Sequence, residues 1–193
     1  FCTRFPKAGT YLKKHKKTIQ DNIKDKKYKR NDSQRWHLYT RESHLETNYP
    51  KVLIPMTAND VYASVTLNDY YYCDNSNVNY TDIPEKTTEN LYAVASIFNS
   101  TIFSILARTI ANKQQNGYFK LNKQYLEPVL FPAYIFEKDK KIVEELANVG
   151  MELEEKQNEY IYAPPHKQKR IKKQLVDLWE MLDRITARAY QLN

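Results

Sequence analysis

The sequence of 193 residues is 41% hydrophobic and 27% charged, which suits one globular domain or a domain with an added element. Its two cysteines, Cys2 and Cys73, form neither a disulfide framework nor a metal-binding spacing, and a reducing cytoplasm is the location we expect. No apolar run approaches the roughly 20 residues of a membrane-spanning helix, so no membrane partner is expected. The first residue is Phe rather than Met, and we expect the chain to be part of a longer polypeptide.

The positive charge is concentrated at the N-terminus. Residues 1–35 contain 12 Lys and Arg against 3 Asp, a net charge of +9, whereas residues 36–193 contain 18 basic and 20 acidic residues, a net charge of −2. Such asymmetry is typical of a protein with a polyanionic partner, most often a nucleic acid. A solvated lysine-rich helix would give the same pattern, so charge alone does not decide between the two interpretations.

The first predicted element is a helix that begins after Pro6. Leu12, Ile19 and Ile23 follow at spacings of seven and four residues and mark one apolar face. The opposite face carries four candidate DNA-binding residues, which are Lys13, Lys14, Lys17 and Lys24.

A polar turn and a short aromatic strand around Trp36 are expected next. A packing role suits Trp36 better than stacking on a base. Arg35 and Arg41 flank the tryptophan, and each is a candidate either for a phosphate contact or for an ion pair within the protein.

Residues 50–73 have the clearest β pattern. Pro50 and Pro55 bracket a buried-type strand at residues 52–54, and residues 61–67 then alternate apolar and polar side chains. Asn68-Asp69 predicts a two-residue hairpin turn, which places Leu67 opposite Tyr70. Residues 75–84 are expected to form a further irregular strand or a loop.

Residues 87–113 predict one continuous helix that is capped by Thr88. Apolar residues recur at helical spacing, at Leu91, Val94, Ala95, Phe98, Ile102 and Ile105. Asn99 and Ser100 are polar on this apolar helix, and we expect them to bond backbone groups inside the domain. Arg108 is expected to extend from the helix toward solvent.

A polar insert separates this helix from the next predicted strand. It consists of residues 113–117, Lys-Gln-Gln-Asn-Gly, and the strand that follows should place Tyr118 and Lys120 on one side and Phe119 and Leu121 on the other. Taken alone, the insert is typical of a solvated turn in which glycine relieves a positive φ.

Two heptad patterns end the chain. Ile142, Leu146, Val149, Leu153 and Tyr160 form the first, and Ile171, Leu175, Leu178, Leu182, Ile185, Ala189 and Leu192 form the second. Since Pro164-Pro165 separates them, we predict an antiparallel helical hairpin. The second helix should be roughly 40 Å long at ~1.5 Å per residue, so we expect it to pack on more than its partner helix.

The sequence contains no complete active-site pattern, and Asp-Ile-Pro-Glu-Lys (82–86) is a lone weak match to the carboxylate-plus-lysine motif of metal-dependent chemistry. Three isolated glycines cannot build a phosphate-binding loop, and no Cys or His cluster has zinc spacing. We therefore predict no catalytic residue, no metal site and no cofactor site in this chain, and we interpret it as a binding module.

Several segments occur in a familiar order: "FPKAGTYLKKHKKTI" (5–19), "WHLYTR" (36–41), "KVLIPMTANDVY" (51–62), "NLYAVASIFNST" (90–101) and "GYFKLNKQYLEPVLFP" (117–132). This order resembles the C-terminal specificity domain, or target recognition domain, of TaqI-like adenine-specific DNA methyltransferases in bacterial type II restriction–modification enzymes. The resemblance covers about residues 5–135. The terminal hairpin is similar to the helices that follow recognition domains in type I specificity subunits.

The resemblance implies that duplex DNA and an upstream catalytic domain of the same polypeptide are the partners. That upstream domain would bind S-adenosylmethionine and carry the Asn/Asp-Pro-Pro-Tyr/Phe motif, and this chain contains neither the cofactor site nor the motif. With this resemblance, base contact becomes the favoured interpretation of the polar insert. The candidate DNA-binding residues there are Lys113, Gln114, Gln115, Asn116, Tyr118 and Lys120.

The predicted fold is α+β, with a small twisted mixed β-sheet packed with helices and a C-terminal antiparallel helical hairpin. We place a DNA target recognition domain at residues 1–136 and the hairpin, as an appendage, at residues 137–193. The expected function is sequence-specific duplex DNA binding within a larger N6-adenine DNA methyltransferase or restriction–modification enzyme. The alternative is an assembly module that docks a partner subunit through the hairpin, and a third possibility is an RNA-binding accessory domain.

Overall fold

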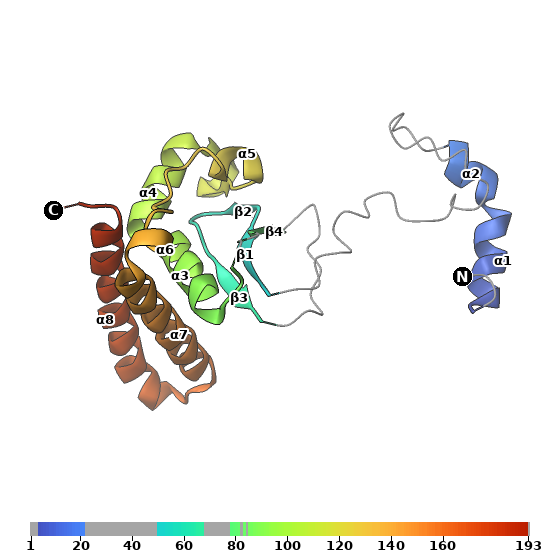
Figure 1. The fold of residues 1–193 in the computed structure, drawn as a ribbon. Helices are drawn as coiled ribbons and strands as arrows, with labels where there is room; N and C mark the ends of the chain where they lie inside the picture. Colours follow the sequence, from blue (N-terminus) through green and yellow to red (C-terminus); the bar gives the residue numbers. More distant parts are fainter. Residues whose placement is uncertain (1–3, 22–49, 68–77, 82, 84, 193) are drawn as a thin grey trace. The chain divides into compact units, whose positions relative to one another are not determined.

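The structure is a computed structural model that describes residues 4–21, 50–67, 78–81, 83 and 85–192 (Figure 1). The chain divides into two compact units, residues 1–46 and residues 47–193. Each unit is described by itself below.

The first unit contains two short helices, α1 (Pro6–Lys14) and α2 (Lys16–Asp21). Pro6 is at the start of α1, where its missing N–H breaks no helical hydrogen bond. His15 separates the helices with φ −102° and ψ 9°, and its N–H donates to the Leu12 carbonyl at 3.0 Å. The single helix predicted here is therefore interrupted. Its extension to Lys24, and the strand around Trp36, lie outside the described residues.

The strands of the second unit form two small antiparallel sheets instead of the one mixed sheet that we expected. The first sheet has the order β3 (Ser64–Thr66), β1 (Lys51–Pro55), β4 (Val78–Thr81), and the second has the order β2 (Thr57–Ala58), β6 (Phe119–Lys120), β5 (Asn112–Lys113). In the first sheet, Leu53 of β1 lies opposite Ser64 and Tyr80. The α+β class is as predicted, whereas the hairpin turn predicted at residues 68–69 lies outside the described residues.

One continuous segment links the two sheets. β1 ends at Pro55 and β2 begins at Thr57, so the chain passes from one sheet to the other at Met56. The Met56 carbonyl accepts a hydrogen bond from the Leu121 N–H at 2.8 Å, and Asn79 Nδ2 donates to the Leu121 carbonyl at 2.7 Å. Leu121, directly after β6, therefore connects the second sheet to Met56 and to β4 of the first sheet.

The helix predicted at residues 87–113 is two helices, α3 (Thr88–Asn99) and α4 (Thr101–Ile110), bent by 62°. Ser100 causes the break, because its extended backbone ends α3 while its hydroxyl accepts a hydrogen bond from Phe103 N–H at 3.2 Å and caps α4. The N-cap of α3 is Thr87, not Thr88; its hydroxyl accepts from Asn90 N–H at 3.1 Å.

Asn99 and Ser100 bond backbone groups, as predicted. The Asn99 side chain accepts from Ala63 N–H at 2.7 Å and donates to the Ala63 carbonyl at 2.8 Å. The Ser100 hydroxyl also donates to the Ile97 carbonyl at 2.7 Å. Asn99 thus satisfies both backbone groups of Ala63, in a segment that precedes β3, and fixes that segment to the end of α3.

The C-terminal hairpin consists of α7 (Lys140–Tyr162) and α8 (Pro165–Ala189), after the short helices α5 (Lys123–Leu126) and α6 (Ile135–Lys138). Asp139 caps α7 by accepting from Ile142 N–H at 3.2 Å, and extended Ala163 and Pro164 end it. The heptad prediction is confirmed at the buried positions Ile142, Leu146, Val149, Leu153, Ile171, Leu175, Leu178, Leu182, Ile185 and Ala189. Leu192 is an exception: it follows the end of α8 and is 55% exposed.

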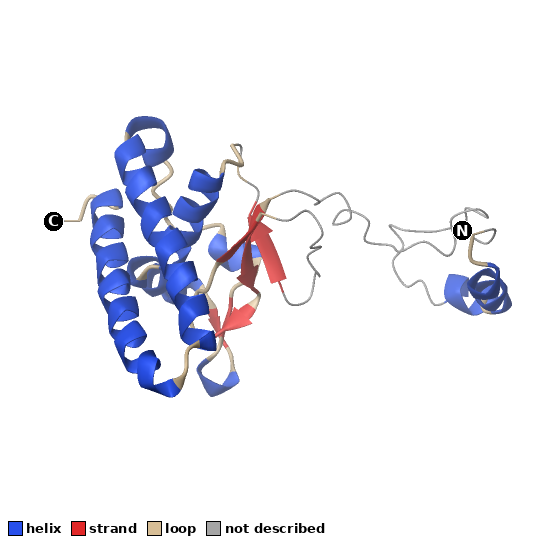
Figure 2. Ribbon diagram, turned by 90° about the horizontal axis from the view of Figure 1, so that it is seen from below, coloured by secondary structure: helices blue, strands red, loops and turns tan. Residues whose placement is uncertain are grey.

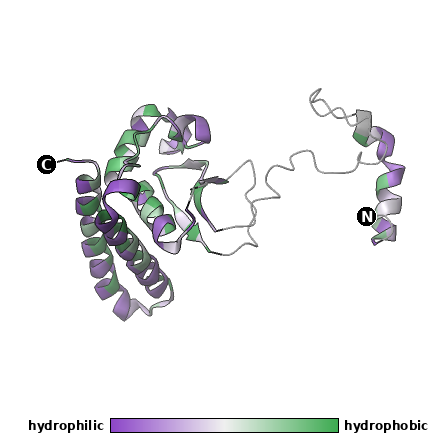
Figure 3. Ribbon diagram, in the orientation of Figure 1, coloured by the Kyte–Doolittle hydropathy of each residue, from purple (hydrophilic) through white to green (hydrophobic). Residues whose placement is uncertain are grey.

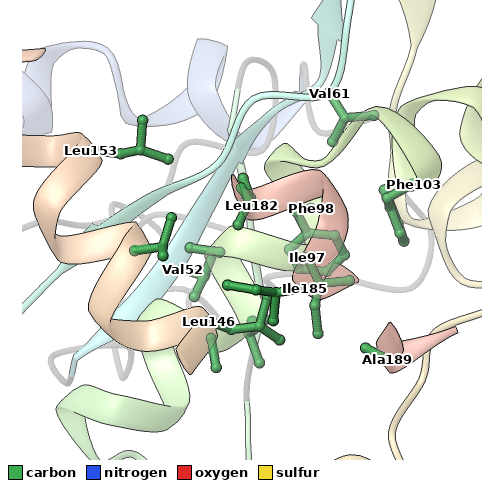
Figure 4. Close-up of a cluster of buried hydrophobic side chains, with 14 of the residues drawn as sticks. Val52, Val61, Ile97, Phe98, Phe103, Leu146, Leu153, Leu182, Ile185 and Ala189 are labelled. Carbon is green, nitrogen blue, oxygen red and sulfur yellow. The ribbon is translucent and has the colours of Figure 1, made fainter. Parts of the chain in front are cut away.

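The hairpin is part of the main core, so the boundary expected at residue 136 does not separate two units of the fold. α3 contacts β1 and β3 as well as α7, and α7 contacts α8. Because α3 lies between the first sheet and the hairpin, residues 93–98 are buried without interruption (Figures 1 and 2). Figure 3 shows the apolar side of the hairpin helices turned inward, and Figure 4 shows Leu146 and Leu182 grouped with Ile97 of α3.

Candidate nucleic-acid interface

The polar insert forms the tip of a hairpin between β5 and β6, with η3 (Gln115–Gly117) as its loop. Gln114 N–H donates to the Tyr118 carbonyl at 2.7 Å and closes the loop. Asn116 has φ 60° and ψ 26°, and Gly117 has φ 79°. Both lie in the left-handed region that asparagine and glycine tolerate best, so backbone geometry accounts for Asn116-Gly117. It does not account for the two glutamines before them.

The sheet register brings five polar residues to one face. Lys120 lies opposite Thr57 on one side and Asn112 on the other, and directly paired residues point to the same face of a sheet. Alternation along the strands adds Gln114 and Tyr118 to that face. We call the set of Thr57, Asn112, Gln114, Tyr118 and Lys120 the polar face.

The polar face is hollowed at the hairpin tip. Thr57, Gln114, Gln115 and Tyr118 line an open hollow with a volume of about 480 Å³. Tyr118 is 46% exposed, and a side chain placed at Gly117 would meet no atom within 4 Å. The tip therefore projects into solvent, and a second molecule can approach both the hollow and the loop.

The side chains around the hollow have hydrogen-bonding capacity to spare. Gln114 Nε2 donates to the Lys113 carbonyl at 3.1 Å and more weakly to Asn112 Oδ1 at 3.4 Å. Within the described residues, the side chains of Gln115, Asn116 and Tyr118 have no hydrogen-bond partner. Amides and a phenol offer both donors and acceptors, and the polar face contains no carboxylate, so it suits an anionic partner with mixed donors and acceptors.

Lys113, which we predicted as a DNA-binding candidate together with Gln114, does not belong to the polar face. It pairs with Phe119, which in turn pairs with Ala58, so these three residues share the opposite face. Arg108 lies on this second face too, with its guanidinium carbon 5.7 Å from the centre of the Phe119 ring.

We expected Arg108 to extend from its helix into solvent, but its guanidinium group is bound to other residues of the protein. Its Nη2 forms an ion pair with Asp60 at 2.7 Å and donates to the Asn59 carbonyl at 3.2 Å. Asp60 Oδ1 also accepts from Val61 N–H at 2.9 Å. Arg108 therefore joins α4 to the segment between β2 and β3, which is a structural role.

The N-terminal basic residues form a second group in the other unit. Lys13, Lys14 and Lys17 are exposed on α1 and α2, as predicted. The other candidates, Lys24, Arg35 and Arg41, lie outside the described residues. The two groups belong to separate units. Within the second unit, the sheet brings Gln114, Tyr118 and Lys120 to one face and places Lys113 on the other.

Sequence reasoning missed Thr57 as a member of the site. No local pattern marks it, because only the pairing of β2 with β6 brings it beside Lys120, 63 residues later in the chain. A strand-pairing register is the signal that would have found it, and that signal is not local.

The described part of the chain has neither a metal-binding cluster nor a single helix that could span a membrane. No group of three or more His, Cys, Asp or Glu side chains there could hold a metal ion. No single described helix is both long and apolar enough to cross a membrane; only α3 and α4 taken together, across their bend, reach that length and composition.

No protein-family model matches this chain, and no curated protein is significantly similar to it. What is established is therefore an α+β unit with two small antiparallel sheets, three packed layers and a hollowed polar face.

Proposed function

We propose that this chain binds duplex DNA and reads its sequence with the polar face and the adjoining η3 loop, as the target recognition part of a larger N6-adenine DNA methyltransferase or restriction–modification enzyme. The observation that carries the proposal is the open hollow lined by Gln114, Gln115 and Tyr118 on a surface without carboxylates. The order of sequence segments that resembles TaqI-like specificity domains supports the same function.

The hairpin tip has the chemistry for base recognition. The major groove of B-DNA, about 12 Å wide, admits a two-stranded β-ribbon such as β5 and β6. A glutamine or asparagine amide can pair with N6 and N7 of adenine, and a lysine can donate to O6 and N7 of guanine. Gln114, Gln115 and Asn116 are the proposed base-reading residues, and Lys120 contributes either to guanine or to a phosphate.

Phosphate contacts come from the basic N-terminal unit. Lys13, Lys14 and Lys17 are exposed, and Lys24, Arg35 and Arg41 extend the same positive segment in the sequence. Such contacts position a protein on DNA without reading its sequence. In the proposed parent enzyme, the recognition part holds the duplex while the target adenine is extruded into the upstream domain, where S-adenosylmethionine binds.

A binding selection with the purified chain and a pool of random duplexes tests the proposal. We expect enrichment of one short sequence, which the Gln114→Ala, Gln115→Ala double variant loses. A Lys138→Ala, Lys140→Ala double variant, with both changes on the exposed surface around the start of α7, is the matched control and should select the wild-type sequence. If the wild-type chain enriches no sequence, recognition by this chain is disproved; an RNA pool run beside it tests the RNA-binding alternative.

The alternative function is docking of a partner subunit through the hairpin. Val176 and Trp179 of α8 favour it, because these large apolar side chains are 49% and 39% exposed and lie three residues apart on one helix. Val176→Ser with Trp179→Ser should then weaken a complex with that partner and leave DNA binding unchanged.

A further inference from the structure

A second concentration of positive charge lies at the start of α8. Six basic side chains occupy residues 166–173, and the next acidic residue is Asp177. The net charge of −2 over residues 36–193 conceals this segment, because acidic residues elsewhere offset it. The six are His166, Lys167, Lys169, Arg170, Lys172 and Lys173, and all are exposed.

This arrangement opposes the stability of the helix. Cations three and four residues apart on a helix are neighbours and repel one another, as Lys169 does with Lys172 and Lys173. Other described helices also begin with lysines, as α7 does at Lys140 and Lys141, but there Asp139, Glu144 and Glu145 lie beside them. The start of α8 has no acidic residue before Asp177 to offset its cations, which points to a role other than stability.

The acidic residues of α7 do not neutralise the outer part of this segment. Lys156 bonds Glu159 at 2.7 Å and, with smaller contributions from Arg170 and Lys167, lowers the pKa of that carboxyl. Lys169, Lys172 and Lys173 form no ion pair with any described residue. They are three and four residues apart, so they are neighbours on the exposed surface of α8.

An exposed aromatic side chain lies at the same end of the hairpin. Tyr162, the last residue of α7, is 86% exposed at the turn that leads into α8. Lysine ammonium groups and tyrosine hydroxyls are both groups with which proteins contact DNA phosphates. A membrane-binding helix needs instead a continuous exposed apolar face, and the apolar residues of this part of α8, Ile171 and Leu175, are buried in the core.

We propose that Lys169, Lys172, Lys173 and Tyr162 form a phosphate-backbone contact site for nucleic acid at the end of the helical hairpin, separate from the polar face. The site binds without sequence preference, since ammonium groups contact phosphates and read no base edge. The inference takes duplex DNA as the ligand from the proposed function.

The test measures duplex affinity against salt for the full chain, with a random-sequence duplex as the probe. The patch variant is Lys169→Gln, Lys172→Gln, Lys173→Gln. The control variant, Lys138→Gln, Lys140→Gln, Lys141→Gln, removes the same charge at the opposite end of the hairpin, where Glu137, Asp139, Glu144 and Glu145 interleave with the lysines. At roughly 0.9 per phosphate contact, the patch variant should flatten the slope of log affinity against log salt by about 2–3, and the control should change it little.

The stability of the patch variant is a second readout. Removing three exposed cations that repel one another should leave the variant as stable as the wild type or more stable, so weaker binding cannot be attributed to unfolding. Equal slopes for the patch and control variants would overturn the inference, because net charge alone would then explain binding. Loss of binding to anionic lipid vesicles with unchanged DNA binding would assign the site to a membrane and overturn it as well.

The outcomes separate this inference from the proposed function. If the chain selects a DNA sequence and its patch variant has the same salt slope as the control, the chain has the proposed function and lacks the second site. A chain that selects no sequence, but whose patch variant alone loses salt-dependent binding, has the second site and lacks sequence recognition.

Discussion

Gly150 on α7 lies directly against Ser96 on α3. A methyl group added at Gly150 would come within 2.3 Å of Ser96 Oγ and 3.3 Å of the Tyr92 carbonyl oxygen. Ser96 cannot simply turn away, because its hydroxyl donates to the Leu146 carbonyl at 2.9 Å and is buried. This close approach allows α3 and α7 to pack together, and the contact joins the sheet layer to the hairpin.

Gly150→Ala should destabilise the second unit by about 1–2 kcal/mol. Overpacking a tight contact costs about 1–3 kcal/mol, and the better helix propensity of alanine offsets up to about 1 kcal/mol of that. Urea unfolding followed by circular dichroism measures the change. Combining Gly150→Ala with Ser96→Ala removes the nearest atom, Ser96 Oγ. The double variant should therefore lose less free energy of unfolding than the sum of the losses in the two single variants. Losses that simply add would argue against a direct clash.

Asn99→Ala should cost about 1–3 kcal/mol, because it leaves both backbone groups of Ala63 without their partner in a partly buried site. Asn148→Ala, at an exposed position of α7, is the control and should change stability by less than about 0.5 kcal/mol. Urea unfolding measures the stability of both variants. Hydrogen exchange at the Ala63 amide gives a local measurement, and unchanged protection there would contradict the assigned role.

The stability of the second unit should fall as the pH rises from 10 to 12. Burial, then the hydrogen bond and the charge of Glu154, raise the pKa of Tyr92 from 10.0 to about 12, and burial raises that of Tyr190 to about 12. A folded-state pKa above the unfolded value means that the stabilisation is complete below pH 10 and is lost as the pH passes through the folded value. Urea unfolding at a series of pH values measures this loss.

Tyr92→Phe should reduce the pH dependence, since it removes the hydroxyl that donates to Glu154 at 2.5 Å. Tyr162→Phe is the matched control, because that side chain is 86% exposed. Equal pH dependence in the wild type and Tyr92→Phe would show that this hydroxyl is not responsible.

The basic N-terminal unit should govern the salt dependence of DNA binding but not its sequence preference. Lys13→Gln, Lys14→Gln and Lys17→Gln together should flatten the slope of log affinity against log salt by up to about 2.7, or roughly 0.9 for each phosphate contact. The selected sequence should remain that of the wild type. Fluorescence anisotropy at several salt concentrations supplies the slope, and an unaltered slope would mean that these lysines do not face DNA.

Substitutions of the two glutamines at the hairpin tip should instead change the sequence preference and not the salt dependence. Gln114→Ala or Gln115→Ala should relax one base of the selected sequence, since a good bidentate pair discriminates by about 1–3 kcal/mol, while the salt slope stays unchanged because no charge is lost. Lys113→Gln, on the other face of the same strand, should reduce the slope slightly and leave the selected base intact. Sequencing of selected duplexes distinguishes these outcomes.

Local patterns in the sequence predicted some elements well. The positions of Leu146 and Leu178 followed from their heptads, because a 3.5-residue repeat directly marks the side of a helix that is buried. The backbone role of Asn99 was predictable too, since an amide on an apolar helix has to find partners. The break at Ser100 was not, because α3 and α4 are both apolar and their periodicity continues across the cap.

Features that depend on contacts between distant residues could not be predicted from the sequence. The separation of Lys113 from Gln114 arises because residues 112–113 form a strand and not the end of the predicted helix, and the inclusion of Thr57 in the polar face depends on strand pairing. Two-residue strands carry too little periodicity to define a register. The hairpin was expected to be an appendage for a similar reason, since heptads show that a helix is buried and do not show which element covers it.

The passage of the chain from one sheet to the other at Met56 limits how a recognition surface of this kind can diversify. Leu121 holds β6 to Met56, directly after the buried strand β1, so the hairpin tip cannot shift without disturbing the core. Asn116 and Gly117 meanwhile maintain the loop conformation and leave the side chains at positions 114 and 115 free to vary. Under the proposed function, a related protein would therefore acquire a new DNA target by exchanging a few side chains on an unchanged backbone, at little cost to folding.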